Sequence, residues 1–200
     1  MLNNPNARRA MNAVLEPPAR LLLRMRVSPD AITVLGTLLV VVTALICFPT
    51  DRFILGPLLI ALFAFSDLLD GTMARMRGTS GPWGNFLDAT LDRIADGAIF
   101  GGIVLWGAVN DQIGVTSAAL LCLVMGQVTS YAKARAEAVG ATANVGIAER
   151  AERLMVVLLA VFITGCGVPY VLPAALWILG ALGIVTVVQR IVTVRGQLRP

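Results

Sequence analysis

The sequence has no histidine and few charged or aromatic residues: 14% of its 200 residues are charged and 6% are aromatic. Imidazole is the side chain that most often transfers protons near neutral pH, and it is a frequent zinc ligand. Without it, acid–base chemistry in this chain must use carboxylates, hydroxyls or lysine. The same absence argues against a zinc site.

Cysteine is also scarce. Cys47, Cys122 and Cys166 each lie within an apolar run. An odd number of cysteines in such runs does not predict a disulfide framework, and we expect three small packed thiols.

Hydrophobic residues are abundant, at 57% of the chain, which is too many for a soluble domain of this length. Apolar runs of the length that crosses a bilayer predict six transmembrane helices. Turn-forming residues separate them. We therefore predict an all-α integral membrane protein with a juxtamembrane segment at residues 1–30 and a six-helix membrane domain at residues 31–200. The expected spans are residues 31–48, 53–69, 86–109, 115–131, 154–168 and 170–194.

The basic residues predict the orientation of these helices. With an even number of spans both termini share one face, and every lysine and arginine except Arg52 falls on or near it. By the positive-inside rule this face is cytoplasmic, so we expect a multi-pass protein of the cell (inner) membrane. The net charge of +4 suits anionic membrane lipid, and no nucleic-acid partner is expected because aromatic stacking groups are not interleaved with the arginines.

The juxtamembrane segment has no signal-peptide pattern, so no cleavable signal is expected. Its pattern suits an amphipathic helix on the cytoplasmic surface, starting at Pro17 and Pro18, although a merely basic flank that sets topology is equally compatible. The residues of this pattern are Leu15, Ala19, Leu22, Leu23 and Met25, mixed with Arg20, Arg24 and Arg26.

Aspartates crowd into the second and third expected spans. Asp67 and Asp70 are three residues apart, and Asp88 and Asp92 are four apart, so each pair shares a helix face. Charges within a membrane cost about 3 kcal/mol each and need compensation. All-carboxylate ligands select hard ions, so two divalent ions, Mg²⁺ or Mn²⁺, are expected, as suits phosphoryl transfer.

The alternative for these four aspartates is pairing with Arg75, Arg77 and Arg93 in the headgroup region. Asp96 is a separate case, since it can equally belong to a network with Arg93 or with another helix. Nearby small residues, Gly81 among them, would let a bulky head group approach the backbone, although small residues also pack membrane helices.

The aspartates belong to a longer motif, which runs from Asp67 to Asp92. It reads Asp67-Leu-Leu-Asp70-Gly71-Thr-Met-Ala74-Arg75, then eight residues, then Gly84-Asn-Phe-Leu-Asp88-Ala-Thr-Leu-Asp92. This resembles the signature of the CDP-alcohol phosphotransferase family at every fixed position. The resemblance implies a six-helix membrane enzyme, usually a homodimer, in which Asp67, Asp70, Asp88 and Asp92 bind two metal ions and Asp92 is also the general base.

The same resemblance implies a site for CDP-diacylglycerol. Gly71, Ala74 and Arg75 would line its CDP group, and the stretch at the start of the first span would contribute to the nucleotide site. That stretch also reads as an ordinary helix start, with Ser28 or Asp30 as the N-cap. Its residues are Pro29, Asp30, Ala31, Ile32 and Thr33.

Several further stretches resemble actinobacterial phosphatidylinositol phosphate synthases, among them residues 21–36, 130–138, 149–154 and 188–190. In those enzymes the residues that match Ser130, Lys133, Arg153 and Arg190 form the pocket for the phosphate of inositol 1-phosphate. The residues agree independently, because these cations come from three helices and meet at the cytoplasmic end, where a dianionic acceptor needs them. Topology control with headgroup contact is the alternative, and Arg135 and Arg150 have weaker claims.

Other functions remain open at this stage. Glycerol 3-phosphate presents the same dianion, so a phosphatidylglycerol phosphate synthase is the nearest alternative. An unphosphorylated acceptor would make the three cations dispensable. A cation transporter would use intramembrane acids too, but it predicts a repeated half that the sequence lacks. A small assembly protein would leave the aspartates unexplained.

Overall fold

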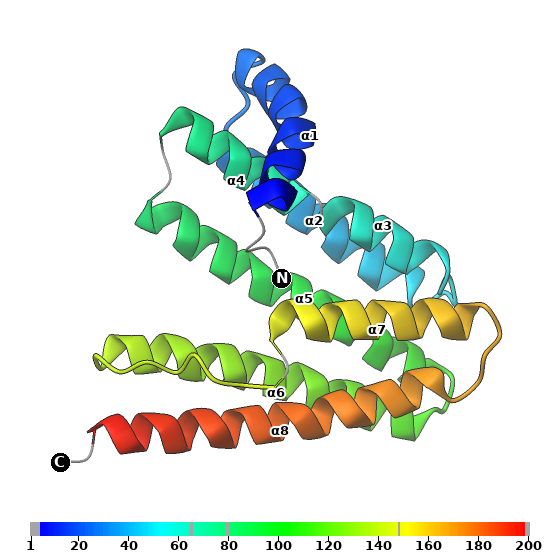
Figure 1. Ribbon diagram of the computed structural model, residues 1–200. Helices are drawn as coiled ribbons and strands as arrows, with labels where there is room; N and C mark the ends of the chain where they lie inside the picture. Colours follow the sequence, from blue (N-terminus) through cyan, green and yellow to red (C-terminus); the bar gives the residue numbers. More distant parts are fainter. Residues whose placement is uncertain (1–4, 65, 79–80, 148, 199–200) are drawn as a thin grey trace. The chain divides into compact units, whose positions relative to one another are not determined.

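The computed structural model describes residues 5–64, 66–78, 81–147 and 149–198, and all regular structure within them is helical (Figure 1). This confirms the predicted all-α class. In chain order the helices are α1 (Pro5–Arg24), α2 (Pro29–Cys47), α3 (Leu55–Ala64), α4 (Ser66–Arg77), α5 (Pro82–Val109), α6 (Ile113–Ala138), α7 (Arg150–Gly165) and α8 (Val171–Leu198).

Within the described residues, four segments are long and apolar enough to cross a membrane: α2, the segment Leu55–Arg77 that holds α3 and α4, α6 and α8. The other two expected spans coincide with α5 and α7. Helix α7 has 16 residues, and in α5 the charges of Asp92, Arg93 and Asp96 shorten the uninterrupted apolar stretch. The four spans support a membrane protein, and the count of six stays a prediction.

The helices extend past the apolar runs that predicted them. Helix α6 continues to Ala138, α7 begins at Arg150, and α8 continues to Leu198. Hydropathy marks only the part of a helix that suits hydrocarbon, whereas the backbone hydrogen bonds continue into polar segments. These polar helix ends carry Lys133 and Arg153, two of the four residues predicted to bind the acceptor.

The chain forms two compact units, one of residues 1–42 and 58–95 and the other of residues 43–57 and 96–200. In the first unit α1 packs against α4. Leu15 and Ala19 of α1 are buried, and its predicted place on the membrane surface stays a prediction. The predicted start of this helix was wrong: it begins at Pro5, and Pro17 and Pro18 lie inside it.

In the second unit α8 packs against both α6 and α7 (Figure 1). Glycines bring α8 close to α6, since a Cβ at Gly183 would lie 2.8 Å from the Cβ of Met125. Aromatic rings of Phe48, Phe53 and Trp106 gather in the same unit, and the Trp106 indole donates a hydrogen bond to the Asp51 carboxylate. Small residues along the helices and rings at one end therefore build this core.

Gly102 on α5 tests this close packing. A Cβ at Gly102 would lie 2.6 Å from the carbonyl oxygen of Ala44, whereas one at Gly101 would meet no described atom within 4 Å. We expect Gly102→Ala to destabilise the protein by about 1–3 kcal/mol because backbone must move. Gly101→Ala is the matched control and should unfold near the wild-type temperature. Thermal unfolding in detergent measures both, and equal melting temperatures would contradict this packing.

Candidate functional site

Two of the helices in the first unit carry the predicted metal ligands. Asp67 and Asp70 lie on α4, and Asp88 and Asp92 lie on α5, each pair on one helix face as expected. Asp70 is buried, Asp88 is exposed and Asp92 is partly buried. The side chain of Asp67 lies outside the described residues.

Asp70 is tied to α2 through Thr33. The Thr33 hydroxyl lies 2.5 Å from Oδ2 of Asp70 and 3.2 Å from the Pro29 carbonyl oxygen, and both Thr33 and Asp70 are buried. The short contact to the carboxylate is the stronger one because its acceptor is charged. Thr33, predicted to bind the nucleotide, therefore also orients a predicted metal ligand.

Negative charge is concentrated around Asp70. Its carboxylate interacts electrostatically with those of Asp88 and Asp30. Like charges in a poorly solvated place repel, and a bound cation relieves that repulsion. The surroundings of Asp70 thus suit a cation.

The start of α2 has the ordinary cap that the sequence suggested. The Ala31 N–H donates to Ser28 Oγ at 3.2 Å, so Ser28 is the N-cap and Pro29 is the first helical residue. Asp30 follows in the first turn, and its carboxylate accepts a hydrogen bond from the Trp83 indole at 2.9 Å. Trp83 was not among the predicted site residues, since one aromatic residue near a helix start carries no distinctive pattern.

The other predicted nucleotide-site residues lie on α4 or just before α5. Arg75 is exposed and donates from Nη2 to the Thr72 hydroxyl at 2.9 Å. Gly71 lies one turn earlier on α4, where a Cβ would come within 3.6 Å of Arg75 Nη1. Ala74 is half-buried on α4, and Gly81 is exposed immediately before α5. The Arg75 guanidinium is thus accessible to an anion.

The second unit gathers three of the four residues predicted to bind the acceptor. Arg190 of α8 donates from Nη1 to the Thr129 carbonyl at 2.6 Å and from Nε to the Val145 carbonyl at 3.0 Å. Arg153 of α7 lies against Gly126 of α6, whose carbonyl accepts the Ser130 hydroxyl at 3.1 Å. Ser130, Arg153 and Arg190 therefore meet at one stretch of α6, and the exposed Lys133 follows on the same helix.

Asp96 of α5 forms an ion pair with Arg153. Its buried carboxylate accepts hydrogen bonds from Arg153 Nη2 and from Arg150 Nε, both at 3.1 Å. Of the two networks considered for Asp96, these contacts support the one with another helix, and they give Arg150 a partner. The sequence signal was a charge in an apolar helix, which must find a partner but does not say which.

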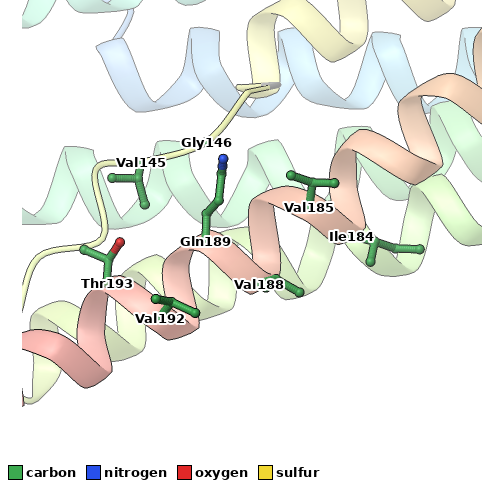
Figure 2. Close-up of a pocket in the computed structure, with 8 residues that line it drawn as sticks. All are labelled: Val145, Gly146, Ile184, Val185, Val188, Gln189, Val192 and Thr193. Carbon is green, nitrogen blue, oxygen red and sulfur yellow. The ribbon is translucent and has the colours of Figure 1, made fainter.

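An apolar cavity of about 640 Å³ lies between α8 and the loop that precedes α7 (Figure 2). In Figure 2 the Gln189 side chain points from α8 toward the loop at Gly146. No residue predicted for the site is among the residues that line this cavity. The lining residues are Val145, Gly146, Ile184, Val185, Val188, Gln189, Val192 and Thr193.

Comparison with known proteins decides the family. The sequence matches the model of the family described as CDP-alcohol phosphatidyltransferase over residues 26–192. The chain belongs to this family. Its members are transferases, so the enzyme class predicted from the Asp67 to Asp92 motif is confirmed.

Curated relatives within the family share one name. A phosphatidylinositol phosphate synthase of Streptomyces avermitilis is 48% identical over 97% of this chain and 83% of its own length. One of Corynebacterium glutamicum is 44% identical over 94% of this chain and 86% of its own length. These names agree with the predicted activity.

Solved structures of the phosphatidylinositol phosphate synthase of Mycobacterium tuberculosis have the same fold. The structure with CDP-DAG bound has a TM-score of 0.87 and 40% identity, covering 94% of this chain and 98% of that one. The structure in complex with manganese and citrate has a TM-score of 0.85 and 41% identity, covering 92% and 91%. A family relative thus binds the predicted lipid nucleotide and a divalent metal.

The aspartates of this family member fit a divalent metal in donor chemistry. All four offer carboxylate oxygens, which Mg²⁺ and Mn²⁺ prefer. The concentrated negative charge around Asp70 fits as well. The side chain of Asp67 is not among the described residues. Within the residues that are described, no three Asp, Glu or Cys side chains lie close enough together to hold a metal ion.

The Thr33–Asp70 contact generates a prediction. Thr33→Val keeps the shape of the side chain but removes the donor, leaving the buried Asp70 carboxylate less satisfied, so stability should fall by about 1–3 kcal/mol. Thr43→Val on the same helix is the control, because Thr43 is also buried and has no side-chain hydrogen bond among the described residues. Equal melting temperatures of the two variants in detergent would argue against the contact.

Proposed function

We propose that this chain transfers the phosphatidyl group of CDP-diacylglycerol to inositol 1-phosphate, producing phosphatidylinositol phosphate and CMP. The meeting of Ser130, Arg153 and Arg190 at one stretch of α6 supports a phosphorylated acceptor, a class that includes both inositol 1-phosphate and glycerol 3-phosphate. Buried guanidinium groups suit a phosphate dianion, because they combine charge with several fixed donors. Of these two acceptors, the names of the curated relatives favour inositol 1-phosphate.

In this proposal Asp92 is the general base. It accepts the proton of the acceptor hydroxyl, and that oxygen forms a bond to the β-phosphorus of CDP-diacylglycerol. The bond from this phosphorus to the oxygen that bridges the two phosphates breaks, and CMP leaves with the electron pair. Carboxylate is the natural base here, since the chain has no histidine.

Asp67, Asp70, Asp88 and Asp92 would hold two divalent ions, Mg²⁺ or Mn²⁺. Such ions, when bound, neutralise the oxygens of a diphosphate and orient it for in-line attack. Thr33 keeps Asp70 oriented through its hydrogen bond. Arg75 would bind the diphosphate, and Gly71, Ala74, Gly81 and the α2 start at residues 29–33 would accommodate the CDP group. The accessible guanidinium of Arg75 supports this role.

The remaining features follow from the reaction and the charges. The lipid substrate is a membrane component, and α5 and α7 would complete six spans with the four apolar segments. Both termini and the site would face the cytoplasm from the inner membrane, by the distribution of arginines. Helix α1 would lie on the cytoplasmic surface, since it has one buried apolar face and exposed arginines. The resemblance further suggests a homodimer.

The acceptor is tested with purified protein, CDP-diacylglycerol and Mg²⁺ by measuring CMP release. Inositol 1-phosphate should support faster release than glycerol 3-phosphate, and unphosphorylated inositol should support little. Arg190→Gln should raise the KM for inositol 1-phosphate by about tenfold or more, as expected when a buried charged contact is lost. The exposed Arg195 on the same helix gives the control, Arg195→Gln. Faster release with glycerol 3-phosphate would overturn the choice of acceptor.

Asp92→Asn tests the base. The amide cannot accept the proton, so turnover should fall by a factor of about 10² to 10⁴. Melting temperature and CDP-diacylglycerol binding should stay near wild type, because the side chain keeps its size and is only partly buried. Near-normal turnover in this variant would remove Asp92 from the role.

A further inference from the structure

Asp96 is the one carboxylate of the aspartate-rich region to which the proposed reaction assigns no part. Its side chain is 3% exposed, and it contacts two arginines of α7. Arg153 contributes a nearly buried guanidinium, 6% exposed, whereas that of Arg150 is 29% exposed. A buried carboxylate with two guanidinium groups is a fixed structural unit, because leaving either buried charge unpaired is costly.

Arg153 is confined on its other side by α6. A Cβ at Gly126 would lie 3.0 Å from Cζ and 3.1 Å from Nη2 of Arg153, so the guanidinium occupies the space that a side chain would fill. Nη2 is also the atom that donates to Asp96. Glycine on α6 and carboxylate on α5 thus hold the same end of Arg153.

Although Arg153 is held in this way, part of its guanidinium can still donate a hydrogen bond. Its Nε is buried and has no hydrogen-bond partner among the described residues. Thr129, which lies between Gly126 and Ser130, likewise has a buried hydroxyl without a partner in this part of the chain, and its carbonyl accepts Arg190. Buried donors without partners are uncommon and mark a place where a ligand can supply acceptors.

The charges of the arginines around Arg153 also favour an anionic ligand. Arg190 is buried, donates to two neutral carbonyls and interacts electrostatically with Arg153, which is repulsive, and with Glu149, which is attractive. The three guanidinium groups of Arg150, Arg153 and Arg190 outnumber the two carboxylates of Asp96 and Glu149 that interact with them. The cluster therefore retains positive charge that suits an anionic ligand.

We propose that Asp96 is a positioning residue for the acceptor: by holding Arg153 against Gly126, it presents the remaining donors of Arg153 to the phosphate group of the acceptor. This inference rests on the proposed function, in which Arg153 binds that phosphate. Asp96 itself does not touch the substrate. Its carboxylate makes Arg153 stable in a buried position before the acceptor arrives, so binding does not have to order that side chain.

The first experiment compares Asp96→Asn with wild type. The amide loses the charge and offers a donor where an acceptor is needed, so Arg153 is no longer held. The KM for inositol 1-phosphate and the inhibition constant of inorganic phosphate should both rise about tenfold, the effect of losing one charged contact. The KM for CDP-diacylglycerol should stay within twofold. Asp111→Asn is the control, since Asp111 is exposed in a turn at φ 55°, where asparagine is well tolerated.

A double-mutant cycle shows whether Asp96 acts through Arg153. In an Arg153→Gln background, Asp96→Asn should raise the acceptor KM no further, because the group that it positions is gone. Independent multiplication of the two effects would overturn the proposal. So would an unchanged or lowered acceptor KM in Asp96→Asn, which would mean that Asp96 only offsets charge.

Asp96→Glu keeps the test decisive if the asparagine variant does not fold. Glutamate retains the charge with a longer side chain, so the acceptor KM should lie between those of wild type and Arg153→Gln, again without a change for CDP-diacylglycerol. Equal increases for both substrates would show general damage and would overturn the proposal. Failure of the proposed function is a separate result: wild-type protein would then release no CMP with inositol 1-phosphate.

Discussion

Burying charge in a weakly solvated interior is costly unless each ion is paired or hydrogen-bonded, and this constraint governs the charged residues of each unit. Asp96 is buried with Arg153 and Arg150, Asp70 accepts the Thr33 hydroxyl, and Arg190 donates to two backbone carbonyls. In each group charged side chains and their partners lie on different helices, and Arg190 also contacts the loop before α7 through the Val145 carbonyl, so satisfying these charges also ties the helices together. The chain has few charged residues, and several of them lie in the clusters that a phosphate-transfer enzyme needs.

Close packing of helices at glycines also supports these charged clusters. Glycine lets the Arg153 guanidinium rest against the backbone of α6 at Gly126, and it lets α5 approach the Ala44 carbonyl at Gly102. In water apolar side chains drive such contacts, whereas in a bilayer helices associate through packing and hydrogen bonds, which favours small residues at the contact. Small residues therefore do two things here: they bring helices together and make room for a charged side chain.

Much of the fold and part of the site could be predicted from residue patterns. The apolar runs predicted helices, and the spacing of Asp67, Asp70, Asp88 and Asp92 predicted that each pair shares a helix face, because helix periodicity is local. The polar extensions of α6, α7 and α8 were not predicted, since hydropathy reports the solvent around a helix and not its hydrogen bonds. Pro17 was expected to start a helix that in fact begins at Pro5. Proline favours helix starts, but the packing of Leu15 and Ala19 holds this helix through it.

The sequence by itself determined the family, the membrane class and the acidic motif, because these depend on composition and on residues close together along the chain. Only the tertiary structure decided which cations share a place and which carboxylate holds them. Arg153 and Asp96 are 57 residues apart, and Arg190 and Thr129 are 61 apart. Partners at such separations are chosen by how helices pack. The stretch at residues 149–154 singled out Arg153, but nothing local in the sequence pointed to Asp96 as its partner.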